Sequence, residues 1–163
     1  MNRPTLLPGL ARIWRGPTEL QLGSGPARAV LLQLPDPRVA GLLDLLDGSR
    51  SERLVLLEAA QRGIPPGDAQ VLLETLQAAG LALPATALLP PLSEPARTRL
   101  LSEAGALAHT HPRSAPARTL RHRAASRVVI SGYGRLGAGI AVALAEAGVG
   151  HVQPDLPGEV VAG

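Results

Sequence analysis

Apolar and polar residues alternate near the start of the chain, which is the pattern of short, half-buried strands. In Glu19-Leu20-Gln21-Leu22 the alternation is strict and places both leucines on one face. The segments 11–15 and 28–34 have a similar character, and the turn sequences Gly16-Pro17 and Gly23-Ser24-Gly25-Pro26 separate the three segments. We therefore predict strands at 11–15, 19–22 and 28–34 that form a small antiparallel meander.

The spacing of apolar residues then changes to that of helices. Asp36 is placed to cap a first helix that has proline at its first position. The apolar residues of this helix recur at i, i+3, i+4 and i+7: Val39, Leu42, Leu43 and Leu46. Ser49 or Ser51 can cap a second helix, for which Gly63 supplies a left-handed stop. A third helix is predicted from 65 to 80, so three helices follow the three strands.

Residues 81–83 predict a short closing strand, after which the composition changes. Between 84 and 126 prolines recur and arginines cluster, and only 96–108 has the leucine spacing of a helix. This composition predicts a linker over 84–126 that is helical in part at best. The pattern therefore divides the chain into a front domain at 1–83, the linker, and a last domain at 127–163.

The last domain begins with a strand, a glycine-rich turn and a helix. Val128-Val129-Ile130 is a short strand of the buried type, a helix is predicted over 136–147, and 151–153 can form a second strand. Such a unit joins two parallel strands through a crossover helix. The sequence therefore predicts the first β-α-β unit of a nucleotide-binding fold, which is incomplete at Gly163.

Three glycines of that unit have the spacing of a phosphate-binding turn. Gly132 allows the tight turn, Gly134 lets the backbone approach a phosphate, and Gly137 permits close packing of the helix. The amides and the dipole of the helix N-terminus would hold the phosphate. Asp155 or Glu159 would have to supply the acidic ribose ligand, which is expected about 20 residues after the turn. The alternative is that the glycines serve only to pack the strand against the helix.

The composition narrows the classes of protein that remain. Aromatic residues make up 1% of the chain, so its cores are aliphatic, and Trp14 is expected to anchor the core of the front sheet. All sixteen basic residues are arginine, and the net charge of +3 is a weak argument for nucleic acid binding. The absence of cysteine excludes disulfides and thiolate metal sites. No segment reaches the roughly 20 apolar residues of a membrane span, and the start lacks a secretory signal, so we expect a cytoplasmic protein.

The glycine turn of 132–137, the Ala- and Leu-rich helix after it and Gly148-Val149-Gly150 resemble the opening of the ThiF/MoeB family, bacterial relatives of ubiquitin-activating enzymes. The resemblance implies a Rossmann-like fold that adenylates a protein C-terminus with ATP. It also implies that the three glycines bind ATP and that Asp155 binds the ribose. The family's catalytic Arg, Asn and Lys and its metal-binding Asp would fall after Gly163. We therefore assign no catalytic or metal-binding residue, and expect no activity from this chain alone.

The front domain is similar to PqqD-like domains, the precursor-recognition elements in the biosynthesis of ribosomally synthesised and post-translationally modified peptides. The similarity lies in three small strands, a winged three-helix unit, Leu45-Leu46-Asp47-Gly48 at the end of the first helix and Leu76-Gln77-Ala78-Ala79-Gly80-Leu81 at the end of the third. It implies that a leader peptide joins the sheet edge as an added strand beside the third helix. The candidate contacts are Arg28, Gln70, Val71 and Thr75. The alternative is a solvated Arg28 and a core Val71.

These features predict an α/β protein that recognises a precursor or leader peptide, together with a partner modifying enzyme or a second copy. One alternative is an ATP-dependent ThiF-type adenylyltransferase of which this chain is an N-terminal fragment, and another is a nicotinamide or flavin oxidoreductase. Winged-helix DNA binding is disfavoured, because the polar face of the third helix is net negative. That face carries Asp68, Gln70, Glu74 and Gln77. A metal site needs at least three ligands that converge from rigid structure, and the spacing of the four histidines does not indicate such a set. No metal site is therefore predicted.

Overall fold

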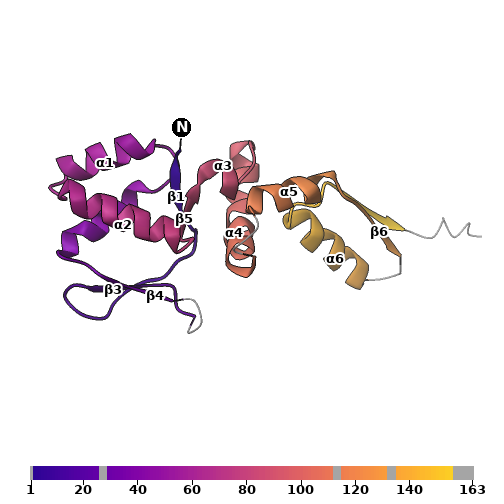
Figure 1. The fold of residues 1–163 in the computed structure, drawn as a ribbon. Helices are drawn as coiled ribbons and strands as arrows, with labels where there is room; N and C mark the ends of the chain where they lie inside the picture. The colour runs from indigo at the N-terminus through magenta and orange to yellow at the C-terminus, as the bar shows by residue number, and fades with distance from the viewer. Residues whose placement is uncertain (1, 26–28, 112–114, 132–134, 156–163) are drawn as a thin grey trace, which may run out of the picture. The chain divides into compact units, whose positions relative to one another are not determined.

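A computed structural model describes residues 2–25, 29–111, 115–131 and 135–155 (Figure 1). The chain divides into two compact units, Met1–Leu88 and Leu89–Gly163. Each unit combines helices with small sheets of short strands, so the predicted α/β class is confirmed.

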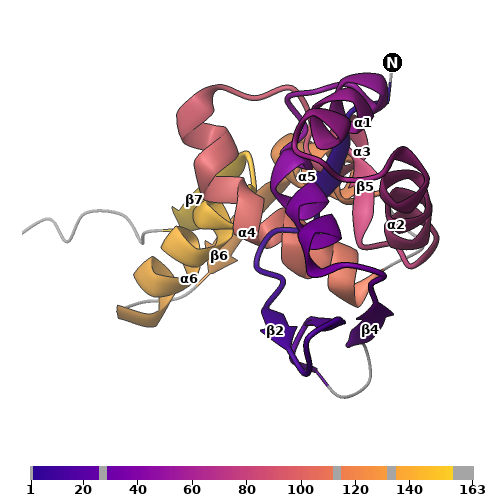
Figure 2. The same ribbon diagram turned by 90° about the vertical axis from the view of Figure 1, so that its left-hand side faces the viewer.

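The front unit contains the predicted three-stranded meander. Its strands are β2 (Arg12–Trp14), β3 (Glu19–Leu22) and β4 (Val30–Gln33), which pair antiparallel in the order β2-β3-β4. β2 and β4 are its two edge strands (Figure 2). Leu20 lies opposite Leu32, and both are buried because alternate residues of the paired strands face the core. The prediction that Trp14 is a core anchor is wrong, because this residue lies on the edge strand β2 and is 47% exposed.

A second, two-stranded sheet closes the front unit. β1 (Pro4–Leu6) pairs antiparallel with β5 (Ala82–Pro84), which is the predicted closing strand shifted by one residue. The Leu7 amide continues this contact by donating to the Leu81 carbonyl at 2.8 Å. Sequence analysis assigned no strand to β1, because three residues are too few to show an alternation.

The three predicted helices are present as η1 (Pro37–Leu45), α1 (Glu52–Gln61) and α2 (Pro66–Ala78). Asp36 caps η1 by accepting from the Arg38 amide at 2.8 Å, and Ser51 caps α1. The first helix is a 3₁₀ helix, which the sequence did not indicate. In a helix of three residues per turn, positions i, i+3 and i+6 share one face. Three residues with this spacing are all buried: Val39, Leu42 and Leu45.

Leucines from the meander and the three helices form one core. Its fully buried members include Leu20, Leu22, Leu42, Leu73 and Leu76. α1 and α2 pack against each other and against η1 (Figure 1). This core holds α2 in place, and α2 in turn forms one wall of the candidate site.

Residues 84–126 were expected to form a linker that is helical in part at best. The structure contains more helix than that in this range. α3 (Ala85–Leu88) follows β5, and the second unit then contains α4 (Glu94–Thr110) and α5 (Pro116–Ala125). α4 and α5 pack against each other, and each buries a small apolar set. The members are Leu100, Ala104, Leu107 and Ala108 on α4, and Pro116, Ala117 and Leu120 on α5. Pro95 and Pro116 stand in the first turns of α4 and α5, where the missing amide has no helical partner to lose.

The predicted strand, helix and strand at the end of the second unit are confirmed as a parallel β-α-β unit. β6 (Arg127–Ser131) pairs in parallel with β7 (His151–Asp155), and α6 (Arg135–Glu146) lies between them in the chain. Arg123 on α5 forms an ion pair with Glu103 and donates from Nη1 to the Ala147 carbonyl at 3.1 Å. One arginine therefore joins α4, α5 and the end of α6.

In the part of the chain that the structure describes, no helix combines the length and the apolar character needed to cross a membrane.

Candidate functional site

The outer edge of β4 offers backbone groups to a further strand. Among the described residues β4 pairs with β3 alone. The Leu34 amide donates to the Thr18 carbonyl at 2.8 Å, which makes Leu34 a member of a hydrogen-bonded pair. Such pairs alternate along an antiparallel ladder, so Leu32 bonds to β3, and Leu31 and Gln33 direct their N–H and C=O groups away from it. Four backbone groups are thereby available at the edge.

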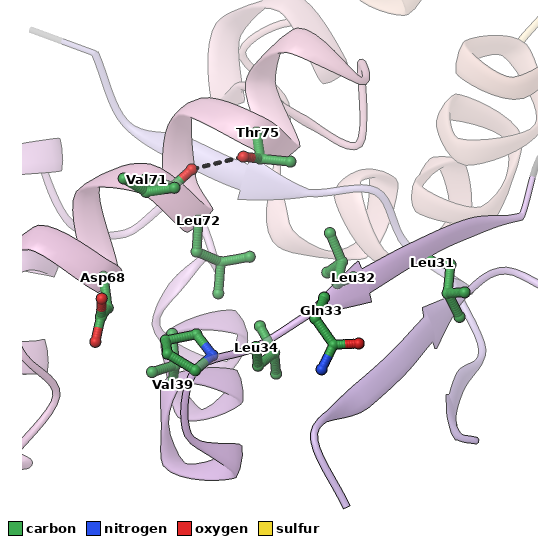
Figure 3. A pocket seen from close by; sticks show the side chains of 10 residues that line it. Leu31, Leu32, Gln33, Leu34, Val39, Asp68, Val71, Leu72 and Thr75 are labelled. Carbon is green, nitrogen blue, oxygen red and sulfur yellow. Dashed lines mark hydrogen bonds between the residues drawn. The ribbon is translucent and has the colours of Figure 1, made fainter. Parts of the chain in front are cut away.

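A groove of about 380 Å³ lies between this strand and α2 (Figure 3). From β4 and the start of η1 it is lined by Leu31, Leu32, Gln33, Leu34, Pro35 and Val39. From α2 it is lined by Asp68, Val71, Leu72 and Thr75. The groove therefore runs beside the free backbone edge, and a chain added to β4 would place side chains in it.

The groove is apolar at its base and along part of its rim. Leu32, Leu34 and Leu72 belong to the buried core, whereas Leu31 and Val71 are 55% and 63% exposed. Exposed apolar side chains beside an unpaired strand edge are typical of a surface that binds another chain. The rim therefore has apolar area available to a partner.

Asp68 is the one charged residue among those lining the groove. Asp36 and Arg38, which are next to the lining residues Pro35 and Val39 in the sequence, form an ion pair at 2.6 Å. Hydrogen bonds from the Arg38 side chain and amide hold the pKa of Asp36 below its ordinary value. This pair is electrically neutral, so Asp68 is the charge that the groove lining presents.

Of the four predicted peptide contacts, two line the groove, one does not, and one lies outside the described residues. Val71 and Thr75 line the groove, and the Thr75 hydroxyl donates to the Val71 carbonyl at 2.7 Å (Figure 3). The exposure of Val71 excludes the alternative that it is a core residue. Gln70 is not among the lining residues and donates to Glu74 at 2.6 Å. Arg28 lies outside the described residues.

Sequence analysis did not single out the groove residues of β4, nor Asp68 as a site residue. The alternation within 28–34 could have identified Leu31 and Gln33 as the positions facing away from the core. The position of Asp68 in the groove had no such signal, because it depends on how α2 lies along β4.

The residues of the predicted nucleotide site are described only in part. Gly132 and Gly134 lie outside the described residues, and Gly137 is in the first turn of α6. Asp155 ends β7 and pairs in register with Ser131 at the end of β6. The carboxyl ends of the two parallel strands therefore meet at one edge, where ligands of such sheets bind. The described residues contain no cluster of three or more metal-ligating side chains.

Several solved structures share the fold of this chain. One is described as a heterocyclase in complex with substrate and cofactor, with a TM-score of 0.56, 18% identity, and coverage of 99% of this chain and 19% of that one. Another is Escherichia coli MccB with AMPCPP and selenomethionine-labelled MccA, with a TM-score of 0.59, 18% identity, and coverage of 94% of this chain and 42% of that one. A third is PaaA, with a TM-score of 0.59, 19% identity, and coverage of 93% and 46%.

The chain thus spans less than half the length of each of these three proteins. The matches cover 93–99% of this chain and show a shared fold, whereas ThiF-like membership and a PqqD-like front domain stay predictions. No protein-family model matches the sequence, and the search of curated proteins gives no match.

Proposed function

We propose that the front unit binds a precursor peptide as an added strand on β4, in the biosynthesis of a ribosomally made peptide natural product. The observation that carries the proposal is the free edge of β4 beside the groove of α2. The N–H and C=O groups of Leu31 and Gln33 would pair with the peptide backbone. Side chains of the peptide would enter the groove and supply selectivity. The front unit would then act as a PqqD-like recognition domain.

The structural neighbours support a peptide as the partner. MccB was solved together with MccA, which carries selenomethionine and is therefore a polypeptide. At 18% identity this likeness concerns the fold. For this chain, the geometry of β4 and α2 argues for the same class of partner independently.

The substitution Gln33→Pro tests whether the peptide pairs with the backbone of β4. The Gln33 amide faces away from β3, so Gln33→Pro removes a donor needed by the guest strand while leaving the ladder to β3 intact. We expect a labelled leader region of the precursor peptide encoded beside the gene to bind about three- to tenfold more weakly to this variant in fluorescence anisotropy, as the loss of one neutral backbone hydrogen bond predicts. Gln33→Ala keeps the amide and is the matched control.

Unchanged binding by Gln33→Pro would remove the strand-addition model. A failure of the wild-type chain to bind the leader at tens of micromolar would remove peptide recognition altogether. Thermal unfolding of each variant shows that the meander is retained.

A second candidate function is ATP-dependent adenylation of a ThiF type, with this chain as one part of the enzyme. The parallel strands β6 and β7 with α6 favour a Rossmann-like unit, and MccB has been solved with ATP and with AMPCPP. Gly137 and Asp155 would contribute to the nucleotide site, with Gly132 and Gly134 in the turn. Equilibrium dialysis with ATP and pyrophosphate exchange test this candidate; retention of ATP without exchange would indicate nucleotide binding alone.

A further inference from the structure

We infer that the groove selects a guest strand with apolar side chains at alternate positions and a basic residue at the end next to Asp68. The inference rests on the proposed peptide binding and specifies the class of peptide. It concerns the side chains that enter the groove, whereas the preceding proposal concerns the backbone.

The alternation follows from the register at the edge. A guest strand bonded to the outward groups of Leu31 and Gln33 places its intervening residues opposite Leu32 and Leu34. Residues directly opposite each other in paired strands project to the same face, so these guest side chains point into the groove. There they meet Leu32, Leu34 and Leu72, which favour apolar partners. The volume of about 380 Å³ is near the lower end of ligand pockets, about 300 to 1,000 Å³, and suits a few side chains.

The basic residue follows from the charge at one end. Asp68 lies in the first turn of α2 and lines the groove, on the side of Val39 in the view of Figure 3. α2 contains two acidic residues and no basic one. Glu74 is occupied by a hydrogen bond from Gln70, whereas Asp68 has no ion-pair or side-chain hydrogen-bond partner among the described residues. A guest arginine or lysine at this end would pair with it.

Three labelled peptides test this inference, all with a Leu-Ser-Leu-Ser-Leu centre and with arginine, serine or glutamate at both ends. Equal ends make the result independent of the direction of the guest strand. We expect the arginine peptide to bind about three- to fivefold more tightly than the serine peptide, as an exposed ion pair allows, and the glutamate peptide to bind most weakly. A fourth peptide, with serine in place of leucine, should lose binding.

Two variants show whether Asp68 causes the order. Asp68→Asn should bring the three leucine peptides to equal affinity, and Glu74→Gln, an acid on the same helix that does not line the groove, should keep the order. Raising the salt to 0.5 M should narrow the differences in the wild-type chain, because screening weakens exposed pairs. Thermal unfolding of each variant checks that the fold is retained.

Equal binding of the three leucine peptides, or an order that persists in Asp68→Asn, would overturn the basic preference while leaving peptide binding in place. Binding of the natural leader without binding of any leucine peptide would overturn the alternation. Failure of the leader and of all designed peptides would instead remove the proposed function.

Discussion

The two compact units differ in how completely they bury their own apolar residues. In the front unit the meander and three helices enclose one leucine core, which includes Leu73 with no exposed surface. In the second unit the β-α-β segment leaves Val129 65% and Leu136 82% exposed, and other apolar residues of α6 are exposed as well. A helix with apolar residues on all sides is normally buried. The front unit therefore encloses its apolar core, whereas α6 retains exposed apolar surface among the described residues.

The units also differ in charge. The front unit has eight arginines and eight acidic residues, and the second has eight arginines and five acidic residues. The whole surplus of positive charge thus belongs to the second unit. The front groove, by contrast, has a single charged residue in its lining, and that residue is acidic.

The largest expected effect comes from truncating a leucine in the front core. Leu73→Ala should lower the free energy of unfolding of the front unit by about 2 to 5 kcal/mol, because it leaves a cavity in a closed core. Leu136→Ala, in the second unit, should change stability by less than about 0.5 kcal/mol, because the side chain is already exposed. Urea unfolding followed by the fluorescence of Trp14, the one tryptophan of the chain, reports on the front unit.

Far-UV circular dichroism follows both units in the same titration. A large loss of stability in Leu136→Ala would break the comparison, since it would mean that α6 is covered. Equal and small effects of both substitutions would mean that the front core is not closed.

An intermediate effect is expected at Arg123, which joins the elements of the second unit. Arg123→Ala removes the ion pair with Glu103 and the bond to the Ala147 carbonyl. Both side chains of the pair are about a third exposed, so we expect a loss of about 1 to 3 kcal/mol, toward the lower limit. Arg121→Ala, on the exposed face of α5, is the control. The Trp14 signal should be unaffected by either substitution, and a change there would show that the units do not unfold separately.

The smallest expected effect is a loss of stability of the front unit on acidification. Partial burial opposes the charge of Asp47, but hydrogen bonds from Ser49 and Arg50 outweigh it and lower the pKa; that of Asp36 is lowered by Arg38. A carboxylate with a lowered pKa stabilises the fold above its unfolded value of 3.8, and this contribution is lost as the pH falls through the lower, folded value. The Trp14 transition should therefore weaken modestly below about pH 4.

Asp47→Asn should flatten part of this pH dependence. A pH profile that does not change in Asp47→Asn would contradict the assignment.

The sequence predicted well those features that depend on neighbouring residues. The alternation of 19–22 predicted β3, and Asp36 predicted the start of η1. Of the two serines proposed as caps of the second helix, Ser51 is the N-cap, and the predicted left-handed stop at Gly63 is confirmed by a φ of 79°. The β-α-β order of the second unit was predicted in the same way. Each of these rests on backbone preferences or periodicity within a few residues.

Only the tertiary structure decided which distant segments meet. β1 pairs with β5, with Thr5 opposite Leu83. Strands of three residues are too short for their sequence pattern to predict such a pairing. The 3₁₀ form of η1, the packing of α4 on α5, and the position of Asp68 in the groove likewise depend on contacts between elements. The physical reason is that burial is set by the assembled core: local sequence fixes which face of an element is apolar, but the fold fixes which other face it meets.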